Sequence, residues 1–407
     1  TLTLGTTTWN VNGSWTGTTV TNLTFSGASS TINLSGATRT FSGGGKTFGT
    51  VSLACSGTGS LFGTNTYTTL TVTGSAAKTD EWSIAATQTV TGTFTINGNS
   101  ATNRMYMRSG TVGTTSTLSA GTVSVTNCDF RDIVATGAGS WNLSAITGGS
   151  GDCGGNTGIT FTAAANQFWF KNTGNFSTTA NWFLATGGTG GAGRTPLPQD
   201  SAFFDASSFD TAAQTVTQDM PRTGSINWTG ATNTPAFTTS AACECLGSIT
   251  LISGMTLTAS TQAYKLRGRG ANTMTMAGLQ WAKSIELDAP GGTMTMQDAF
   301  LNSDVLIVRN GTFNANNFNV TCSQFLSTAT TTRTVTMGSG TWTLTGTGTL
   351  WSMATVTNLT LNANTSTIKM TDTSATAKTF AGGGKTFNNI WNAPGAGTAT
   401  LNFTGSN

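Results

Sequence analysis

Apolar and hydroxyl side chains alternate along most of this chain, and this alternation limits what the chain can fold into. Segments such as TINL at 31–34, TMTM at 293–296 and TWTLTG at 341–346 carry an apolar residue at every second position. A period of two places neighbouring side chains on opposite faces of a β-strand, whereas an amphipathic helix needs a period of 3.6. Thr and Val also favour pleated backbone because their branched side chains are stiff. The chain is therefore predicted to be all-β.

Two parts of the chain repeat one another. Residues 334–407 repeat residues 1–68, and the alignment places Trp9 on Trp342. Large internal repeats are typical of solenoids and tandem arrays, in which each unit buries its apolar face on a neighbour. We expect the chain to sample a longer repeated array.

One segment helps to choose between the two all-β architectures that the pattern allows, a parallel β-helix (β-solenoid) and tandem β-sandwich domains. In Thr122–Ile133, the inward candidates Val123, Val125, Cys128 and Phe130 are interrupted by Asn127. Asn tolerates a left-handed bend and can bond to its counterpart in the next coil. We therefore predict parallel β-helix bodies, with tandem β-sandwich domains as the alternative.

The composition changes between about residues 166 and 235, where aromatic residues and prolines gather. We interpret 166–235 as a junction or capping segment. It would separate a β-rich module at 1–165, the first copy, from a second β-rich module at 236–407.

The scarcity of charge bears on function. Charged residues make up 8% of the chain, histidine is absent and the net charge is +3. Without histidine the chain lacks the most versatile acid/base group, and its scattered charges form no basic stripe that could follow nucleic acid. No apolar run approaches the roughly 20 residues that cross a bilayer. These observations predict no enzyme activity, no cofactor, no nucleic-acid partner and no membrane span.

Two glycine runs, FSGGGKTF at 41–48 and FAGGGKTF at 380–387, invite comparison with a phosphate-binding loop. The Walker pattern needs an earlier glycine where this chain has Thr40 or Thr379, and it needs a following helix where this chain is strand-like. We interpret both runs as tight turns in which glycines supply positive φ angles. The predicted turn residues are Gly43, Gly44, Gly45, Gly382, Gly383 and Gly384.

Paired carboxylates supply the alternative enzyme hypothesis, because glycan-cleaving enzymes can work with two acids and no histidine. Glu286 and Asp288 would share one strand face, although such pairs are usually solvated and inert. The candidate pairs are Asp80 with Glu81, Asp129 with Asp132, Glu286 with Asp288, and Asp298 with Asp304.

Cysteine and tryptophan raise two further hypotheses. Cys243 and Cys245 look like half of a metal site, but burial as small apolar residues is the preferred interpretation for all the cysteines. Exposed indole rings could stack on sugars, yet most tryptophans, including Trp9 and Trp342, are predicted to lie in the core. The six cysteines are Cys55, Cys128, Cys153, Cys243, Cys245 and Cys322.

Several segments resemble a repeat family met in bacteriophage virion proteins and in large exported surface proteins of bacteria. The segments that carry the resemblance include FWFKNTGNFSTTANWF, PLPQDSAFFDASSF, NGTFNANNFNVTCSQF and TSTIKMTDTSATAKTFAGGGKTFNNI. The resemblance implies a fibrous or appendage component, such as a tail fibre, tailspike, capsid decoration or adhesin, on a virion surface or in the extracellular space.

The leading functional hypothesis is a structural component of such an assembly that contributes to host or surface attachment. Its expected partners are other copies of itself, as in a homotrimer, other virion or surface proteins, and a host surface glycan. The alternatives are a glycan-degrading tailspike, acting as a glycoside hydrolase or polysaccharide lyase, and a carbohydrate-binding bacterial adhesin.

Overall fold

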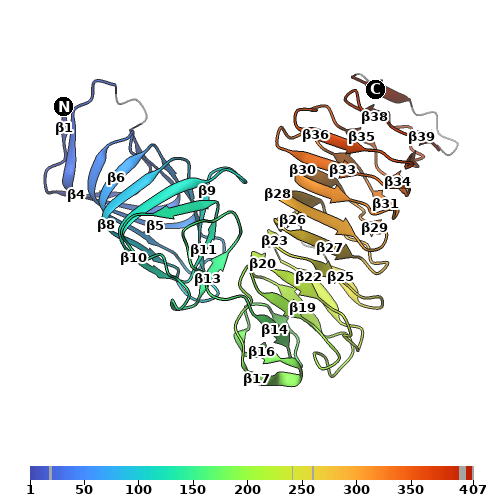
Figure 1. The fold of residues 1–407 in the computed structure, drawn as a ribbon, viewed down its shortest axis with the longest axis horizontal. Coiled ribbons are helices and arrows are strands. Elements are labelled where there is room, and N and C mark those ends of the chain that lie inside the picture. The colour runs from blue at the N-terminus through green and yellow to red at the C-terminus, as the bar shows by residue number, and fades with distance from the viewer. Residues whose placement is uncertain (18–20, 241, 259–260, 394–399, 406–407) are drawn as a thin grey trace. The chain divides into compact units, whose positions relative to one another are not determined.

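The computed structural model describes residues 1–407 except 18–20, 241, 259–260, 394–399 and 406–407. The chain forms two compact units, unit 1 from Thr1 to Ala164 and unit 2 from Ala165 to Asn407. Each unit is a stack of coils in which strands pair in parallel with strands of the coils before and after (Figure 1). The predicted parallel β-solenoid is confirmed.

Unit 1 holds the strands of one large sheet assembly. They are β1 (Leu2–Thr3), β2 (Thr8–Val11), β3 (Trp15–Thr16), β4 (Phe25–Ser42), β5 (Thr47–Phe62), β6 (Asn65–Thr73), β7 (Glu81–Ile84), β8 (Gln88–Asn97), β9 (Met105–Ser109), β10 (Ser116–Thr126), β11 (Cys128–Arg131), β12 (Ile133–Thr136) and β13 (Ser150–Asp152).

Unit 2 distributes its strands over three sheets. The first half of the largest sheet contains β14 (Asn166–Trp169), β16 (Trp182–Ala185), β17 (Thr189–Ala192), β18 (Ser201–Phe203), β20 (Arg222–Thr223), β21 (Ser225–Asn227), β23 (Cys243–Cys245), β24 (Ile249–Thr250) and β26 (Tyr264–Leu266). The second half contains β27 (Ala271–Thr275), β28 (Ile285–Met296), β30 (Leu306–Asn314), β32 (Phe325–Leu326), β33 (Arg333–Thr336), β35 (Gly348–Ser352), β36 (Leu359–Asn362), β38 (Lys378–Ala381) and β40 (Leu401–Thr404).

Two smaller sheets and two short 3-10 helices complete unit 2. One sheet is built from β15 (Gly174–Asn175), β19 (Thr215–Gln218), β22 (Ala236–Thr239) and β25 (Thr256–Thr258). The other is built from β29 (Phe300–Leu301), β31 (Val320–Cys322), β34 (Thr341–Leu344), β37 (Thr367–Met370) and β39 (Asn389–Asn392). The helices are η1 (Thr179–Asn181) and η2 (Thr186–Gly188).

The core of each unit consists of inward side chains stacked in columns from coil to coil. Parallel register places paired residues on the same face, so a column continues through every strand pair. In unit 2 one column runs through seven positions, and all but the last are buried. Its members are Tyr264, Ile285, Leu306, Phe325, Trp351, Phe380 and Phe403.

The first coil of unit 2 is built differently from the later coils. Among the described residues, antiparallel pairing occurs only where β16 pairs with β14 and β17. Trp169 and Trp182 meet edge to face at 5.0 Å in this coil, and both are buried. The range 166–235, interpreted from sequence as a junction or cap, thus forms the opening coils of unit 2. Six of its aromatic residues belong to the core of that unit: Trp169, Phe176, Trp182, Phe204, Phe209 and Trp228.

The bend expected at Asn127 is present, with φ at 47°. Val125, Cys128 and Phe130 on either side of it are buried. The expected bond to a counterpart asparagine is wrong, because the Asn127 side chain donates to the backbone carbonyl of Gly98 at 3.1 Å. The neighbouring coil carries glycine at that position, since an added Cβ would lie 2.0 Å from the Asn127 carbonyl oxygen.

The two sequence copies share their strand pairing. Trp9 of β2 pairs with Ile32 of β4, and its equivalent Trp342 of β34 pairs with Ile368 of β37. Likewise β3 pairs with β4 as β35 pairs with β38. The repeat is therefore a repeat of coils, and β1, β2 and β3 correspond to β33, β34 and β35.

We predict that shortening one member of a core column destabilises unit 2 far more than shortening its outward neighbour. Phe325→Ala should lower the free energy of unfolding by about 3–5 kcal/mol, because it opens a cavity among stacked rings. Leu326→Ala, on the half-buried outer face, should cost less than about 1.5 kcal/mol. Chemical denaturation followed by circular dichroism measures both, and equal losses would contradict the column packing.

Candidate functional site

Both glycine runs form tight turns between consecutive strands, from β4 to β5 in the first copy and from β38 to β39 in the second. In each run the Lys backbone N–H donates to the carbonyl of the first glycine at 3.3 Å, from Lys46 to Gly43 and from Lys385 to Gly382. The flanking phenylalanine rings, Phe41 with Phe48 and Phe380 with Phe387, meet at 5.1 Å in both copies. Both runs are therefore tight turns, as predicted, and each is flanked by a pair of packed phenylalanine rings.

The prediction of positive φ at all three glycines of each run is only partly right. Left-handed backbone occurs at the second and third glycines, Gly44, Gly45, Gly383 and Gly384, whereas Gly43 and Gly382 are not left-handed. Gly43 is needed for close approach, because an added Cβ would lie 2.3 Å from the Asn65 side-chain oxygen. That oxygen also accepts a hydrogen bond from the backbone N–H of Gly45 at 3.2 Å.

The lysine side chain of each turn bonds to a backbone carbonyl of the solenoid. The Lys46 ammonium donates to the carbonyl of Leu23 at 3.1 Å, and the Lys385 ammonium donates to the equivalent carbonyl of Leu359 at 2.8 Å. No helix follows either turn within the described part of the chain, so neither N–H groups nor a helix dipole converge on a phosphate position. The lysines tie the turn to the preceding coil.

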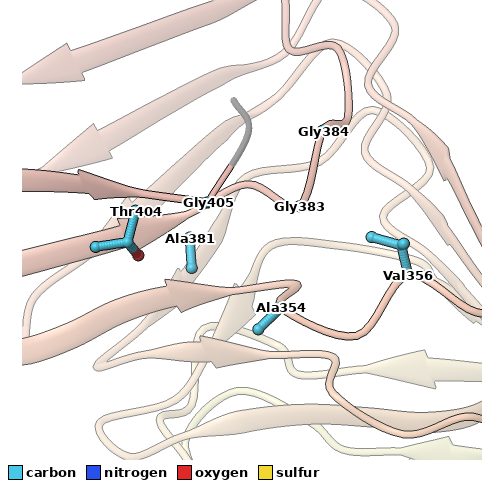
Figure 2. Close-up of a pocket in the computed structure, with 7 residues that line it drawn as sticks. All are labelled: Ala354, Val356, Ala381, Gly383, Gly384, Thr404 and Gly405. Atoms are coloured by element: carbon cyan, nitrogen blue, oxygen red, sulfur yellow. The ribbon is translucent and has the colours of Figure 1, made fainter.

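A hollow of about 420 Å³ lies at the second glycine turn, beside the last coil of unit 2. Figure 2 shows Gly383 and Gly384 on its rim, with Ala354, Val356 and Thr404 around it. Among the described residues its lining consists of small apolar groups, backbone and the Thr404 side chain, and includes no charged side chain. A ligand site usually combines such surface with convergent polar groups, and this hollow lacks them.

Every carboxylate of the candidate acidic pairs in unit 1 has a structural partner. Asp129 is buried against Arg104, with Nε 2.6 Å from the carboxylate. Glu81 receives two hydrogen bonds from Arg108, at 2.8 and 3.1 Å. Asp80 accepts the backbone N–H of Gly57 at 2.7 Å.

The remaining acids of the pairs are also held by their surroundings. Asp132 accepts the backbone N–H of Gly113 at 3.0 Å, and Asp298 accepts that of Met276 at 2.7 Å. Asp304 accepts from the Ser284 hydroxyl at 3.2 Å. These contacts link neighbouring coils or close turns.

Glu286 and Asp288 share one face of β28, as predicted, because Ile285 and Leu287 fill the inner face. The expectation that this face is solvated is wrong at these positions, because both residues are buried. Each carboxylate bonds to an arginine from a different neighbouring coil. Glu286 lies 2.8 Å from Nε of Arg309 on β30, and Asp288 forms an ion pair with Arg267.

These ion pairs belong to a charged belt on the outer face of unit 2. Arg267 also contacts Glu244 at 2.9 Å, so one guanidinium joins carboxylates from the coils before and after it. Strand register places Glu244 beside Lys265, and Lys265 beside Glu286, so the sign alternates from coil to coil. Alternating charge favours one register of the stack, since a slipped coil would bring like charges together.

The cysteines lie in the interior, as predicted; the side chain of Cys55 lies outside the described residues. Burial raises the pKa of Cys243, Cys245 and Cys322 to about 12, so these groups are neutral thiols near pH 7. Metal binding requires the thiolate. Among the described residues no three His, Cys, Asp or Glu side chains gather as a metal site would need.

The tryptophan prediction is right for Trp342 and wrong for Trp9. Trp342 is fully buried, whereas Trp9 is 40% exposed although it occupies the equivalent inward position. The reason is the strand pairing around each residue. Strand β34 of Trp342 pairs with β31 on one side and β37 on the other, whereas among the described strands β2 of Trp9 pairs only with β4. The sequences around Trp9 and Trp342 are similar, so nothing in them indicates that the two side chains differ in exposure.

No family model, curated protein or solved structure matches this chain. The described residues include no helix long and apolar enough to cross a membrane. The candidate functional features described above are the charged belt and the two glycine turns. Sequence reasoning found the acids and glycines but missed Arg267 and Arg309, because only the register between coils brings them to the carboxylates.

We predict unequal effects of removing the two belt arginines. Arg267→Ala should destabilise unit 2 by about 1–3 kcal/mol, because the Arg267 side chain is 7% exposed and its loss leaves Asp288 and Glu244 without their shared donor. Arg309→Ala should cost at most about 1 kcal/mol, because that side chain is 47% exposed. Urea denaturation of the two variants measures the difference, and a larger loss for Arg309→Ala would refute the structural role of the belt.

We predict that stability changes little between about pH 5 and pH 9 and falls above that range. The flat region follows from the absence of histidine. Above about pH 9 the thiols ionise in the unfolded chain but stay protonated in the folded one, because the folded pKa of Cys243, Cys245 and Cys322 is about 12. Each thiol should then cost about 1.4 kcal/mol per pH unit.

The control for the alkaline fall is the variant with Cys243, Cys245 and Cys322 all changed to Ala. It should be less stable near pH 7 because small cavities open, yet its stability should fall less steeply above about pH 9. Melting temperatures across the pH range measure both chains. A large fall between about pH 5 and pH 9, or identical alkaline slopes, would contradict the prediction.

Proposed function

We propose that this protein is a structural component of an assembly on the outside of a virion or a cell, where it serves as a rigid spacer or attachment element. The observation that carries the proposal is the continuous parallel pairing of coils around stacked cores in both units. A solenoid of this kind resists bending and stretching, because each coil is hydrogen-bonded to its neighbours along the axis.

The surface chemistry supports an exposed setting. Threonine occupies outward strand positions, as in TWTL at 341–344, where the inward residues are buried. Few charges and no histidine leave little to be screened by salt or titrated by mild acid. Such a surface keeps its structure across changing external media.

The glycan-degrading alternative has less support. A retaining or inverting enzyme needs one carboxylate free to protonate the leaving group and another free to act as nucleophile or base. Here the paired acids Glu286 and Asp288 are neutralised by Arg309 and Arg267. This arrangement favours a structural role for the pair.

The sugar-binding alternative would need exposed aromatic rings along one groove. Tyr67, Tyr106 and Tyr264 are buried. The most exposed tryptophans, Trp9 and Trp391, lie in end coils of different units. Attachment through a host glycan would thus depend on hydroxyl and amide side chains of the outer face.

Immunogold electron microscopy on the particles or cells that carry this chain tests the proposal. We expect label on the exterior of a particle or cell, and label confined to the interior would refute the proposal. A second assay incubates the protein with capsular polysaccharide and O-antigen and follows chain length. We expect no shortening, whereas shortening that is lost in Glu286→Gln/Asp288→Asn would establish the enzyme alternative.

A further inference from the structure

One outer face of unit 1 carries hydroxyl side chains in a regular arrangement. Strands β5, β6, β8 and β10 pair in parallel, so the outward residues of successive coils lie side by side (Figure 1). Two columns of these residues, separated by two positions along each strand, form what we call the hydroxyl array. The first column is Thr50, Thr69, Thr93 and Thr122, and the second is Ser52, Thr71, Thr95 and Ser124.

The array faces outward because the residues between its columns fill the core. Val51, Leu70 and Phe94 lie between the two columns on β5, β6 and β8, and all three are fully buried. Thr71 and Thr95, on either side of the β6–β8 pairing, are only half-buried. The array is thus a surface of short polar groups on top of a packed core.

The hydroxyl groups of the array are available to water. Among the described residues, none of them forms a side-chain hydrogen bond within the protein. A side-chain bond on the same face joins Thr126 to Asn97 at 3.4 Å, just beyond the second column. The array therefore presents free donors and acceptors in rows.

A similar pair of columns in unit 2 is already in use. Thr312 and Thr334 pair in one of its columns. In the other, the Asn362 side chain donates to the Thr336 hydroxyl at 3.2 Å, and the Asn314 side-chain oxygen accepts a backbone N–H at 2.9 Å. Free hydroxyl groups in two adjacent columns thus distinguish the face of unit 1.

The spacing of the hydroxyl array is set by the sheet. Neighbours within a column lie about 4.8 Å apart and the two columns lie about 6.6 Å apart, because these are the strand spacing and twice the rise per residue of a parallel sheet. Both repeats are close to those of the oxygen atoms on a prism face of hexagonal ice. Threonine is stiff at χ1, so most of these hydroxyls hold their positions with little further loss of side-chain entropy on binding.

We propose that the hydroxyl array of unit 1 binds ice. The water molecules of an ice surface are already ordered, so contact with them avoids the entropy cost of immobilising liquid water. Charged groups would interrupt such a contact because they hold hydration shells of their own, and a sugar-binding face would present aromatic rings. The strand segments that carry the array contain no charged residue, and their one aromatic residue is the buried Phe94; these segments are 50–52, 69–71, 93–95 and 122–124.

Slow growth of ice from a dilute solution of the full chain tests the proposal. Growing ice rejects ordinary solutes, whereas a protein that binds its surface is taken into the solid, and absorbance measures the protein in the ice and in the remaining liquid. Thr71→Tyr/Thr95→Tyr places two bulky rings in the centre of the array. Thr71→Lys is a second array variant, whose long side chain reaches water without disturbing the core.

The matched control is Thr321→Tyr/Thr343→Tyr, with Thr321→Lys beside the lysine variant. Thr321 and Thr343 are also half-buried outward threonines paired between neighbouring coils. They lie in a different sheet, where the next residues of the column are Leu301 and Lys369 in place of hydroxyls. Circular dichroism checks that every variant is folded.

We expect the unaltered chain and both control variants to be at least as concentrated in the ice as in the liquid. Thr71→Tyr/Thr95→Tyr should lower the ratio of protein in ice to protein in liquid by at least about tenfold, because the rings hold the ice surface away from the remaining hydroxyls. Thr71→Lys should lower the same ratio, whereas Thr321→Lys should leave it unchanged.

Rejection of the unaltered chain by the ice would overturn the proposal, and so would equal losses in the array and control variants. A second arm mixes the chain with crystalline cellulose and with chitin, whose surfaces also present ordered hydroxyls. Binding to either of these together with rejection by ice would identify a glycan as the occupant and would equally overturn it.

This inference goes beyond the proposed structural function, and the purified chain tests it independently of where the chain is located. Failure to bind ice leaves the exterior location untouched, which the immunogold experiment tests. The two failures are therefore distinguishable.

Discussion

The register between successive coils is the constraint on which the rest of this structure depends. Parallel pairing places each inward residue on the equivalent residue of the next coil, so one apolar column is extended by every turn of the chain. The column from Tyr264 to Phe403 needs this register to hold through six strand pairs. A slip of one residue would turn every inward side chain outward. The alternating charges of the belt and the half-buried lysine-to-carbonyl bonds at the glycine turns act against such a slip.

The same stacking explains why polar groups that suggest chemistry serve the framework. Arg267 bridges carboxylates from the coils on either side, and Lys46 and Lys385 reach back to carbonyls of the preceding coil. Each contact joins residues far apart in sequence but adjacent along the axis. In a chain with so few charges, this use of the charged groups favours a building element over a catalyst.

Much of the architecture could be predicted from local pattern. The period of two predicts the strands, and the bend at Asn127 lies where the run of inward residues is interrupted. Relations between coils could not be predicted, because they depend on how many residues each turn takes. The ion pairs of Glu286 and Asp288 with Arg309 and Arg267 are of this kind. Trp9 shows the limit most clearly: its sequence context matches that of buried Trp342, but among the described strands β2 pairs on one side only, and Trp9 is 40% exposed.

Hydrogen exchange measured by mass spectrometry on the native chain tests coil-to-coil stacking most directly. If each coil is stabilised by its neighbours, backbone amides of interior strands such as β30 and β33 exchange slowest, and exchange quickens toward β1–β3 and toward β39–β40. Exchange that is as fast in β30 and β33 as in the end coils would show that the coils do not stabilise one another, and it would contradict the account.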